Sequence, residues 1–279
     1  MIFSYVRGAY ILCLSAVICA FQIQPSFAFE TIAPSAILME AQTGNVLYEK
    51  NVDTPIPPAS MSKLMTVYLV FEALDKGRIT KDTEFTISQN ARSQIGSRMF
   101  VEVGKKVKVI DLLRGAIVQS GNDACVALAE GLAGSVAEFV NMMNDAAQKI
   151  GLEQSSFRNP TGLPDDEHLM SVRDLAKLSR SLILNFPGYY KIYSETSFRW
   201  NNIKQGNRNP LLYGYDGADG VKTGYTDAAG YGLVGSARRG NMRLISVVSG
   251  LEKRKQRGTE SRKLLNYGFG RFAMRVIGG

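Results

Sequence analysis

Three short motifs occur in order along the chain, and they restrict its fold more than any other feature of the sequence. They are Ser60-Met61-Ser62-Lys63, then Ser120-Gly121-Asn122, then Lys222-Thr223-Gly224. A serine followed three residues later by a lysine arises by chance about once in a chain of this length. The ordered set is far rarer. A protein that uses all three motifs must bring distant parts of the chain to one cleft.

Residues 1–28 have the features of a secretory signal peptide. Arg7 supplies a positive charge, residues 9–20 form an apolar run, and Ser26-Phe27-Ala28 places small residues where cleavage occurs. The apolar run is short for a transmembrane helix, which needs about 20 residues. We expect cleavage after Ala28, which leaves residues 29–279 as a single domain. An uncleaved anchor is the alternative.

The composition of the remaining chain limits its chemistry. Cys13 and Cys19 lie in the predicted signal peptide, so Cys125 has no partner for an intramolecular disulfide. One cysteine and one histidine, His168, argue against a zinc site. A nucleophilic serine in this chain would therefore need lysine as its base. The net charge of +8 fits general solubility or attraction to an anionic cell envelope, and we expect no nucleic-acid partner.

The pattern of apolar residues and turn signals predicts strands at both ends of the domain with helices between them. Two strands flank the turn at Gln42-Thr43-Gly44, and a helix begins at about Ser60, after three prolines, and stops at Gly77. Ser171 and Asp174 resemble a capping box. The predicted helices are 109–118, 123–132, 136–150, 171–184 and 258–275, and the predicted strands are 36–39, 45–49, 197–201, 220–223, 231–237 and 243–249. This order indicates an α/β (α+β) sheet layer, about 29–85 and 186–279, with an inserted helical part, about 86–185.

The first motif has the spacing of a nucleophile and its base. At the start of a helix, Lys63 falls one turn after Ser60 on the same face, and free backbone N–H groups there favour developing negative charge. Lys63 can accept a proton only if it is neutral, which burial and a second cation such as Lys222 would favour. The simpler interpretation of Ser60 is an ordinary helix N-cap.

The second and third motifs predict the opposite walls of the same cleft. Ser120 and Asn122 flank a glycine at a helix–helix corner, where the hydroxyl could relay a proton and the amide could bind a carbonyl. Ser88-Gln89-Asn90 has the same pattern but lies in a polar stretch, so we favour Ser120 and interpret Ser88 as part of a solvated turn. Lys222 and Thr223 could bind a substrate carboxylate, and Gly224 permits close backbone approach; an exposed lysine on an edge strand is the alternative.

The motifs and their surroundings resemble the catalytic domain of serine-type D-Ala-D-Ala carboxypeptidases, the low-molecular-mass penicillin-binding proteins. The resemblance rests on residues 58–66, 120–124, 207–209 and 219–226 and covers nearly all of the mature chain. It implies an antiparallel sheet covered by helices. It also implies that Ser60 is the acylated nucleophile, Lys63 its base and Ser120 a further catalytic residue. Substrate binding would fall to Asn122, Lys222, Thr223, Gly224 and Arg257, with Arg254 as the rival of Arg257.

The resemblance implies an exported enzyme, in the periplasm or at the outer face of the inner membrane, that trims the terminal D-Ala of peptidoglycan stem pentapeptides. β-Lactams would be covalent inhibitors, and no cofactor or metal is implied. A D,D-endopeptidase, a β-lactamase and a catalytically idle penicillin-binding scaffold are the alternatives. A β-lactamase would need a glutamate for deacylation, and Glu167 lies in the right general region.

Relatives of this kind often continue into a β-rich second domain and a C-terminal membrane anchor. We expect neither in this chain, which stops at Gly279. The basic stretch 253–257 would at most make weak contact with anionic lipid, and a solvated loop and helix start is the favoured interpretation.

Overall fold

The computed structural model describes residues 29–273. The chain divides into two units, Met1–Glu30 and Thr31–Gly279, and every described helix and strand belongs to the second. The predicted signal peptide lies outside the described residues. No single helix in the described part is long and apolar enough to cross a membrane; the helices Asn122–Ala133 and Val136–Lys149 are long and apolar enough only as a pair, and they bend by 86° between them.

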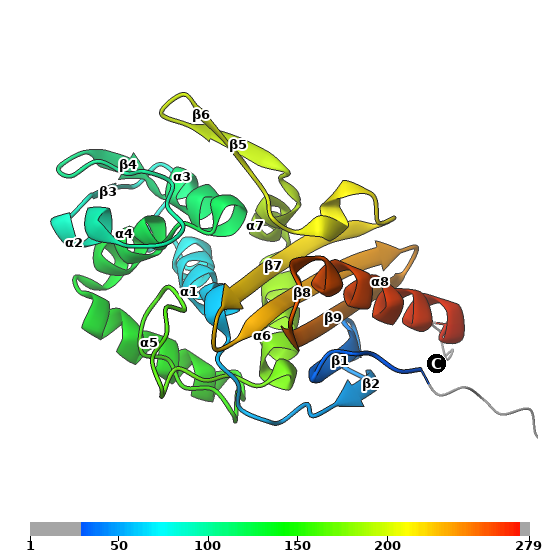
Figure 1. The fold of residues 1–279 in the computed structure, drawn as a ribbon. Coiled ribbons are helices and arrows are strands. Elements are labelled where there is room, and N and C mark those ends of the chain that lie inside the picture. Colours follow the sequence, from blue (N-terminus) through cyan, green and yellow to red (C-terminus); the bar gives the residue numbers. More distant parts are fainter. Residues whose placement is uncertain (1–28, 274–279) are drawn as a thin grey trace, which may run out of the picture. The chain divides into compact units, whose positions relative to one another are not determined.

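The centre of the fold is a five-stranded antiparallel sheet of order β2-β1-β9-β8-β7 (Figure 1). The chain therefore builds its sheet from both of its ends, because β1 pairs with β9. Side chains of β1 are buried on both faces, as expected for a strand covered by helices on each side. The strands of this five-stranded sheet are β1 (Ser35–Glu40), β2 (Val46–Lys50), β7 (Ala218–Thr226), β8 (Gly230–Arg239) and β9 (Met242–Leu251).

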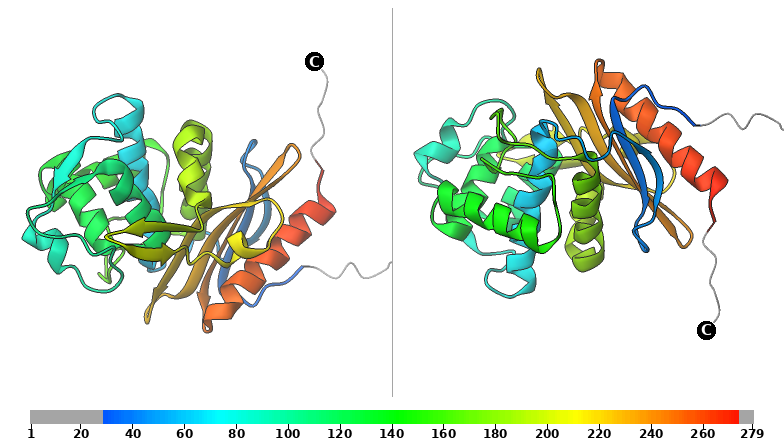
Figure 2. Two further views of the ribbon diagram at one scale, coloured as in Figure 1. Left: turned by 90° about the horizontal axis from the view of Figure 1, so that it is seen from above. Right: turned by 90° about the horizontal axis from the view of Figure 1, so that it is seen from below.

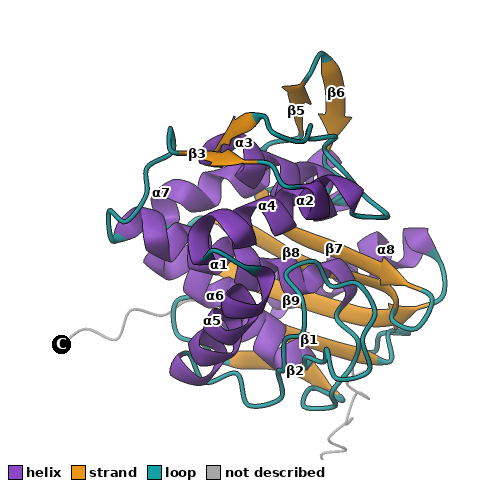
Figure 3. Cartoon of the chain, turned by 90° about the vertical axis from the view of Figure 1, so that its left-hand side faces the viewer, coloured by secondary structure: helices purple, strands orange, loops and turns teal. Residues whose placement is uncertain are grey.

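Helices cover both faces of this sheet. Figure 2 shows α8 on one face, and α6 with the remaining helices on the other. α1 is buried along almost its whole length and packs against α4, α5 and α6, and Figure 3 shows this group in front of the strands. The α-helices are α1 (Lys63–Asp75), α2 (Gln89–Ser93), α3 (Val109–Arg114), α4 (Asn122–Ala133), α5 (Val136–Lys149), α6 (Val172–Asn185), α7 (Pro187–Tyr190) and α8 (Arg254–Arg271).

Short elements join these layers. Two small hairpins, β3 (Glu84–Thr86) with β4 (Lys106–Lys108) and β5 (Ser197–Trp200) with β6 (Ile203–Gly206), lie outside the main sheet. The 3₁₀ turns are Ala59–Ser62, Lys191–Ser194 and Pro210–Tyr213, and a π turn spans Gly115–Gln119.

The predicted fold class is confirmed, and the differences concern the ends of predicted elements and several short elements that were not predicted. The predicted helix 109–118 is α3 followed by the π turn, and the predicted closing helix begins at Arg254 rather than Gly258. Only half of the predicted capping box forms: the Ser171 hydroxyl accepts the N–H of Asp174, but the Asp174 carboxylate instead binds Gln154 N and Ser155 Oγ. The sequence patterns did not predict β3, β4, β6, α2 or α7.

Candidate active site

Ser60 lies in the 3₁₀ turn that leads into α1, and its hydroxyl faces the Lys63 amine. Lys63 Nζ donates to Ser60 Oγ at 2.8 Å, and the Lys63 side chain is fully buried. Neither the turn nor α1 has a side-chain N-cap bond, so the interpretation of Ser60 as an ordinary cap does not apply. The serine oxygen lines an open cleft, while the amine behind it is removed from water.

Burial lowers the pKa of Lys63 to about 8. The charge of Cys125 opposes this shift, Arg208 adds to it, and Asp123 opposes it. The neighbouring cation that depresses this pKa is therefore Arg208, whereas the sequence suggested Lys222. With this pKa about a tenth of Lys63 is neutral at pH 7, against less than about a thousandth for a free lysine, and the neutral form is the one that can accept a proton from Ser60.

A loop of residues 159–163 holds the other side of the Lys63 amine, which also donates to the carbonyl of Thr161. The Asn159 carboxamide organises this loop: its oxygen accepts from Thr161 N, Thr161 Oγ1 and Gly162 N, and its nitrogen donates to Leu163 O. Gly162 has φ +76°, and a Cβ there would lie 1.9 Å from the Ala59 carbonyl. The sequence patterns did not predict this loop, although Asn-Pro is a turn signal.

Ser120 occupies the corner between the π turn and α4. Its backbone is left-handed, with φ 64°, and its hydroxyl accepts from Lys222 Nζ at 2.8 Å. Asn122 Nδ2 donates to the Ile95 carbonyl at 2.7 Å, so this amide is engaged with the loop before the corner. Ser88 is not in the cleft: it caps α2 by accepting from Ala91 N and donates to Glu130. It is thus an N-cap, not a solvated turn residue.

The third motif lies on β7 beside the nucleophile turn. Lys222 is 3% exposed, which rules out the exposed edge lysine, and burial followed by the charges of Lys63 and Arg208 holds its pKa well below the usual range. A Cβ on Gly224 would lie 3.0 Å from both the Pro58 carbonyl and the Met61 side chain. Only glycine lets β7 and the serine turn approach this closely.

The cleft in front of these groups has a volume of about 430 Å³ and one strongly cationic wall. Arg257 on α8 is 5% exposed, and its Nε has no hydrogen-bond partner within residues 29–273. Burial, followed by the charges of Arg254 and Arg208, lowers the pKa of Arg257 to about 10. The residues that line the cleft are Ser60, Ser120, Arg208, Thr223, Gly224, Tyr225, Tyr231, Arg254 and Arg257. Lys63, Asn122 and Lys222 are not among them.

Two residues noted in the sequence lie elsewhere. Glu167 has a side chain 74% exposed and pairs with Arg158 at 3.0 Å, outside the lining of the cleft. His168 is buried against Phe157, accepts the Arg158 N–H at Nδ1, and has its pKa lowered to about 4 by burial. Among the described residues, no three His, Cys, Asp or Glu side chains are grouped as metal ligands.

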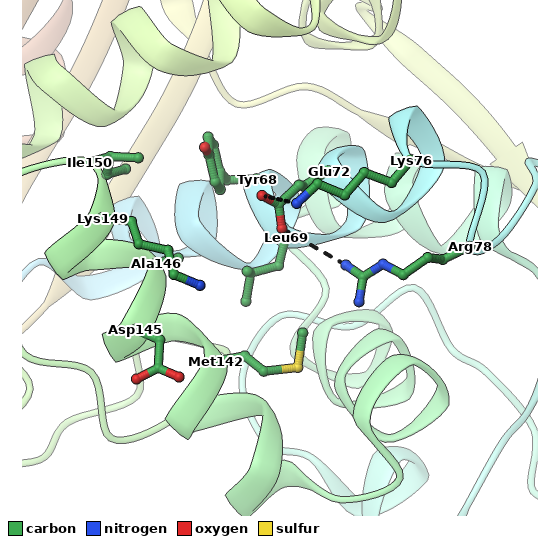
Figure 4. Close-up of a pocket in the computed structure, with 10 residues that line it drawn as sticks. All are labelled: Tyr68, Leu69, Glu72, Lys76, Arg78, Met142, Asp145, Ala146, Lys149 and Ile150. Carbon is green, nitrogen blue, oxygen red and sulfur yellow. Dashed lines mark ion pairs between the residues drawn. The ribbon is translucent and has the colours of Figure 1, made fainter.

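A second depression of about 350 Å³ lies between α1 and α5 (Figure 4). Glu72 pairs there with Lys76 at 2.8 Å and with Arg78 at 3.8 Å, so the charges of these three residues partly neutralise one another within the depression. None of its ten lining residues is a serine, cysteine or histidine. The serine cleft is therefore the candidate active site.

The sheet is covered by helices, and an accessible serine lies next to a buried, partly neutral lysine. These features are typical of a class of proteins in which a nucleophilic serine uses lysine as its base in place of histidine. The chain belongs to the D-alanyl-D-alanine carboxypeptidase family, whose profile matches residues 21–253. It is 44% identical over 248 residues to D-alanyl-D-alanine carboxypeptidase DacF of Bacillus subtilis, covering 86% of this chain and 63% of that protein. It is 43% identical to DacD of Escherichia coli, covering 92% and 71%.

Solved structures agree with this assignment. Penicillin-binding protein 5 from Haemophilus influenzae has a TM-score of 0.85 and 44% identity, covering 87% of this chain and 72% of that one. Penicillin-binding protein D2 from Listeria monocytogenes, solved in an ampicillin-bound form, has a TM-score of 0.79 and 33% identity, covering 88% and 100%. The chain spans a little under two thirds of some of its curated relatives, such as the 63% for DacF.

Proposed function

We propose that the protein is a D-alanyl-D-alanine carboxypeptidase, exported to the periplasm or the outer face of the inner membrane, that removes the terminal D-Ala of peptidoglycan stem pentapeptides. The observation that carries the proposal is the fully buried Lys63 amine, 2.8 Å from Ser60 Oγ and with a pKa near 8. Membership of the family and the ampicillin-bound relative support it.

The proposed acylation begins with attack of Ser60 Oγ on the carbonyl carbon of the penultimate D-Ala. The hydroxyl proton passes to neutral Lys63, and N–H groups at the start of the helical turn stabilise the oxyanion. The carbon–nitrogen bond breaks, and the leaving amine takes a proton from Lys63, relayed through Ser120, which Lys222 holds in place. Water then attacks the ester, gives one proton to Ser60 Oγ through Lys63, and releases the shortened peptide.

The terminal carboxylate of the substrate would bind Thr223 and the guanidinium group of Arg257, which both line the cleft. Such charge-assisted hydrogen bonds favour a free acid over an ester or amide. The exposed position of Glu167 counts against the β-lactamase alternative. Membrane contact stays a weak expectation, since two of the four cations of the 253–257 stretch, Arg254 and Arg257, line the cleft.

The decisive experiment follows the intact mass of the protein during incubation with a β-lactam, alongside assay of a D-Ala-D-Ala peptide. A stable adduct on Ser60 together with release of D-Ala supports the carboxypeptidase. Rapid loss of the adduct would indicate a β-lactamase, and no adduct would indicate an idle scaffold.

Ser60→Ala should abolish labelling and peptidase activity without unfolding the chain, because this hydroxyl caps no helix. Faster cleavage of cross-linked dimers than of pentapeptides would favour the endopeptidase.

A further inference from the structure

The cleft carries more positive charge than one substrate carboxylate neutralises. Arg208, Arg254 and Arg257 line it together, and its lining contains no aspartate or glutamate. Across residues 29–273, none of the three forms an ion pair with a carboxylate. They act on one another instead: burial is the main cause that lowers the pKa of both Arg208 and Arg257, and the charge of Arg254 is the next. The cleft thus holds three guanidinium groups that repel one another.

The three arginines differ in their surroundings. Arg257 is buried, lies over the Tyr231 ring at 5.7 Å, and is the group placed to bind a terminal carboxylate. Arg208 donates to Ser97 Oγ at 2.7 Å. Arg254 is exposed and lies three residues before Arg257 on α8, so the two side chains share a face of the helix.

This spacing suits the two arginines to two different groups of one amino acid, its α-carboxylate and its side chain. A carboxylate held by Arg257 fixes the α-carbon of the terminal residue in the cleft. The side chain of that residue branches from the same carbon, within reach of a guanidinium one helical turn away. The acyl part of the substrate is instead held at Ser60, on the far side of the bond that breaks.

We propose that Arg254, with Arg208, forms a second anion subsite that binds an acidic side chain on the leaving residue. The enzyme would then also hydrolyse stem peptides that end in D-Glu or D-Asp, and would prefer them to their neutral amide counterparts. The reaction is the hydrolysis proposed above: water supplies hydroxyl to the D-Ala carbonyl carbon and a proton to the amine of the released acidic residue. The inference rests on the proposed function.

Two peptides that differ only in the terminal residue, D-Ala-D-Glu and D-Ala-D-Gln, test the subsite, because the two ends match in size and differ in charge. We expect kcat/KM for the D-Glu peptide to be about 1.4- to fivefold higher at low salt, the range of an exposed ion pair. The ratio should fall as salt screens the charges. Arg254→Gln should bring the ratio close to one.

Lys255→Gln is the matched control, because it removes one charge from the same helix without lining the cleft and should keep the wild-type ratio. Equal values for the two peptides in the wild type, or a ratio unchanged in Arg254→Gln, would overturn the subsite. Cleavage of D-Ala-D-Ala in the same preparation shows that such a failure concerns the subsite alone. If D-Ala-D-Ala is not cleaved either, the proposed function has failed as well.

Discussion

The Lys63 amine is a proton acceptor because of what surrounds it. Burial lowers its pKa to about 8, so the protonated form dominates below that pH and the neutral form above it. We expect the rate of acylation by a β-lactam to rise with pH and level off above about 8, measured as a second-order rate from about pH 6 to about pH 10. Lys63→Arg should be nearly inactive, since arginine keeps its proton. An active Lys63→Arg protein would show that the charge alone suffices.

The same shift links pH to stability. The amine has a pKa near 10.4 when unfolded, so the unfolded chain binds this proton more tightly than the folded one. The contribution of Lys63 to the free energy of unfolding should therefore rise as the pH increases from about 8 to about 10.4. A proton acceptor is thus maintained at a cost in stability that is largest at neutral pH and below.

The second prediction at the residue scale concerns binding of the substrate carboxylate by Arg257, which lines the cleft and is buried, with an Nε that has no partner among the described residues. A peptide ending in D-Ala-D-Ala amide should react at least about tenfold more slowly than the free acid, as expected when a charge-assisted hydrogen bond of about 1.5–3 kcal/mol is lost. Arg257→Ala should erase most of this preference while acylation by a simple thioester continues. Equal rates for acid and amide in the wild type would favour the endopeptidase. Loss of the preference in Arg254→Ala but not in Arg257→Ala would reassign the clamp.

Among the elements, the loop of residues 159–163 has the clearest consequence. Asn159→Ala removes four hydrogen bonds that shape it, and we expect a loss of about 2–4 kcal/mol in the free energy of unfolding. Acylation should also slow, because the Thr161 carbonyl no longer holds the Lys63 amine. Asn159→Asp keeps the acceptor oxygens and serves as the comparison, with smaller effects on both. Wild-type acylation in folded Asn159→Ala would show that the loop does not position Lys63.

The sequence was most informative where a side chain itself signals the structure. Ser171 caps α6 as predicted, and the central strands β1 and β9 follow runs of apolar residues. The start of α8 was misplaced because no side chain of the usual capping type marks it: Lys253 N donates to the Gln256 side chain instead. Gly258 looked like a helix start, but it lies inside the helix, where a Cβ would be 2.8 Å from Pro210.

The candidate site likewise combines features that the sequence motifs predicted with features that only the fold determines. The three motifs located the side chains around Ser60, and the structure brings Lys63, Ser120 and Lys222 together as they suggested. The Thr161 carbonyl could not be anticipated, because any residue type carries that group and only the fold aims it. The role of Arg208 was missed for a similar reason, since its charge reaches Lys63 through space rather than through a sequence pattern.

At the scale of the whole molecule, the sheet and the helices depend on each other. β1 pairs with β9 from the end of the chain, and α1, which lies between these two strands in the sequence, is buried against α4, α5 and α6. We therefore expect one cooperative unfolding transition, with helical circular dichroism and labelling by a β-lactam lost at the same denaturant concentration. Labelling lost well before the helical signal would show that the cleft opens as a separate unit.

The pairing of β1 with β9 also sets when activity can arise. β1 meets β9 only after almost the whole chain has been made, and β7, which carries Lys222, meets β8 only shortly before that point. A chain still being synthesised therefore has the serine without the completed cleft around it. The serine cleft is complete only when the last strand, β9, pairs with the first strand, β1.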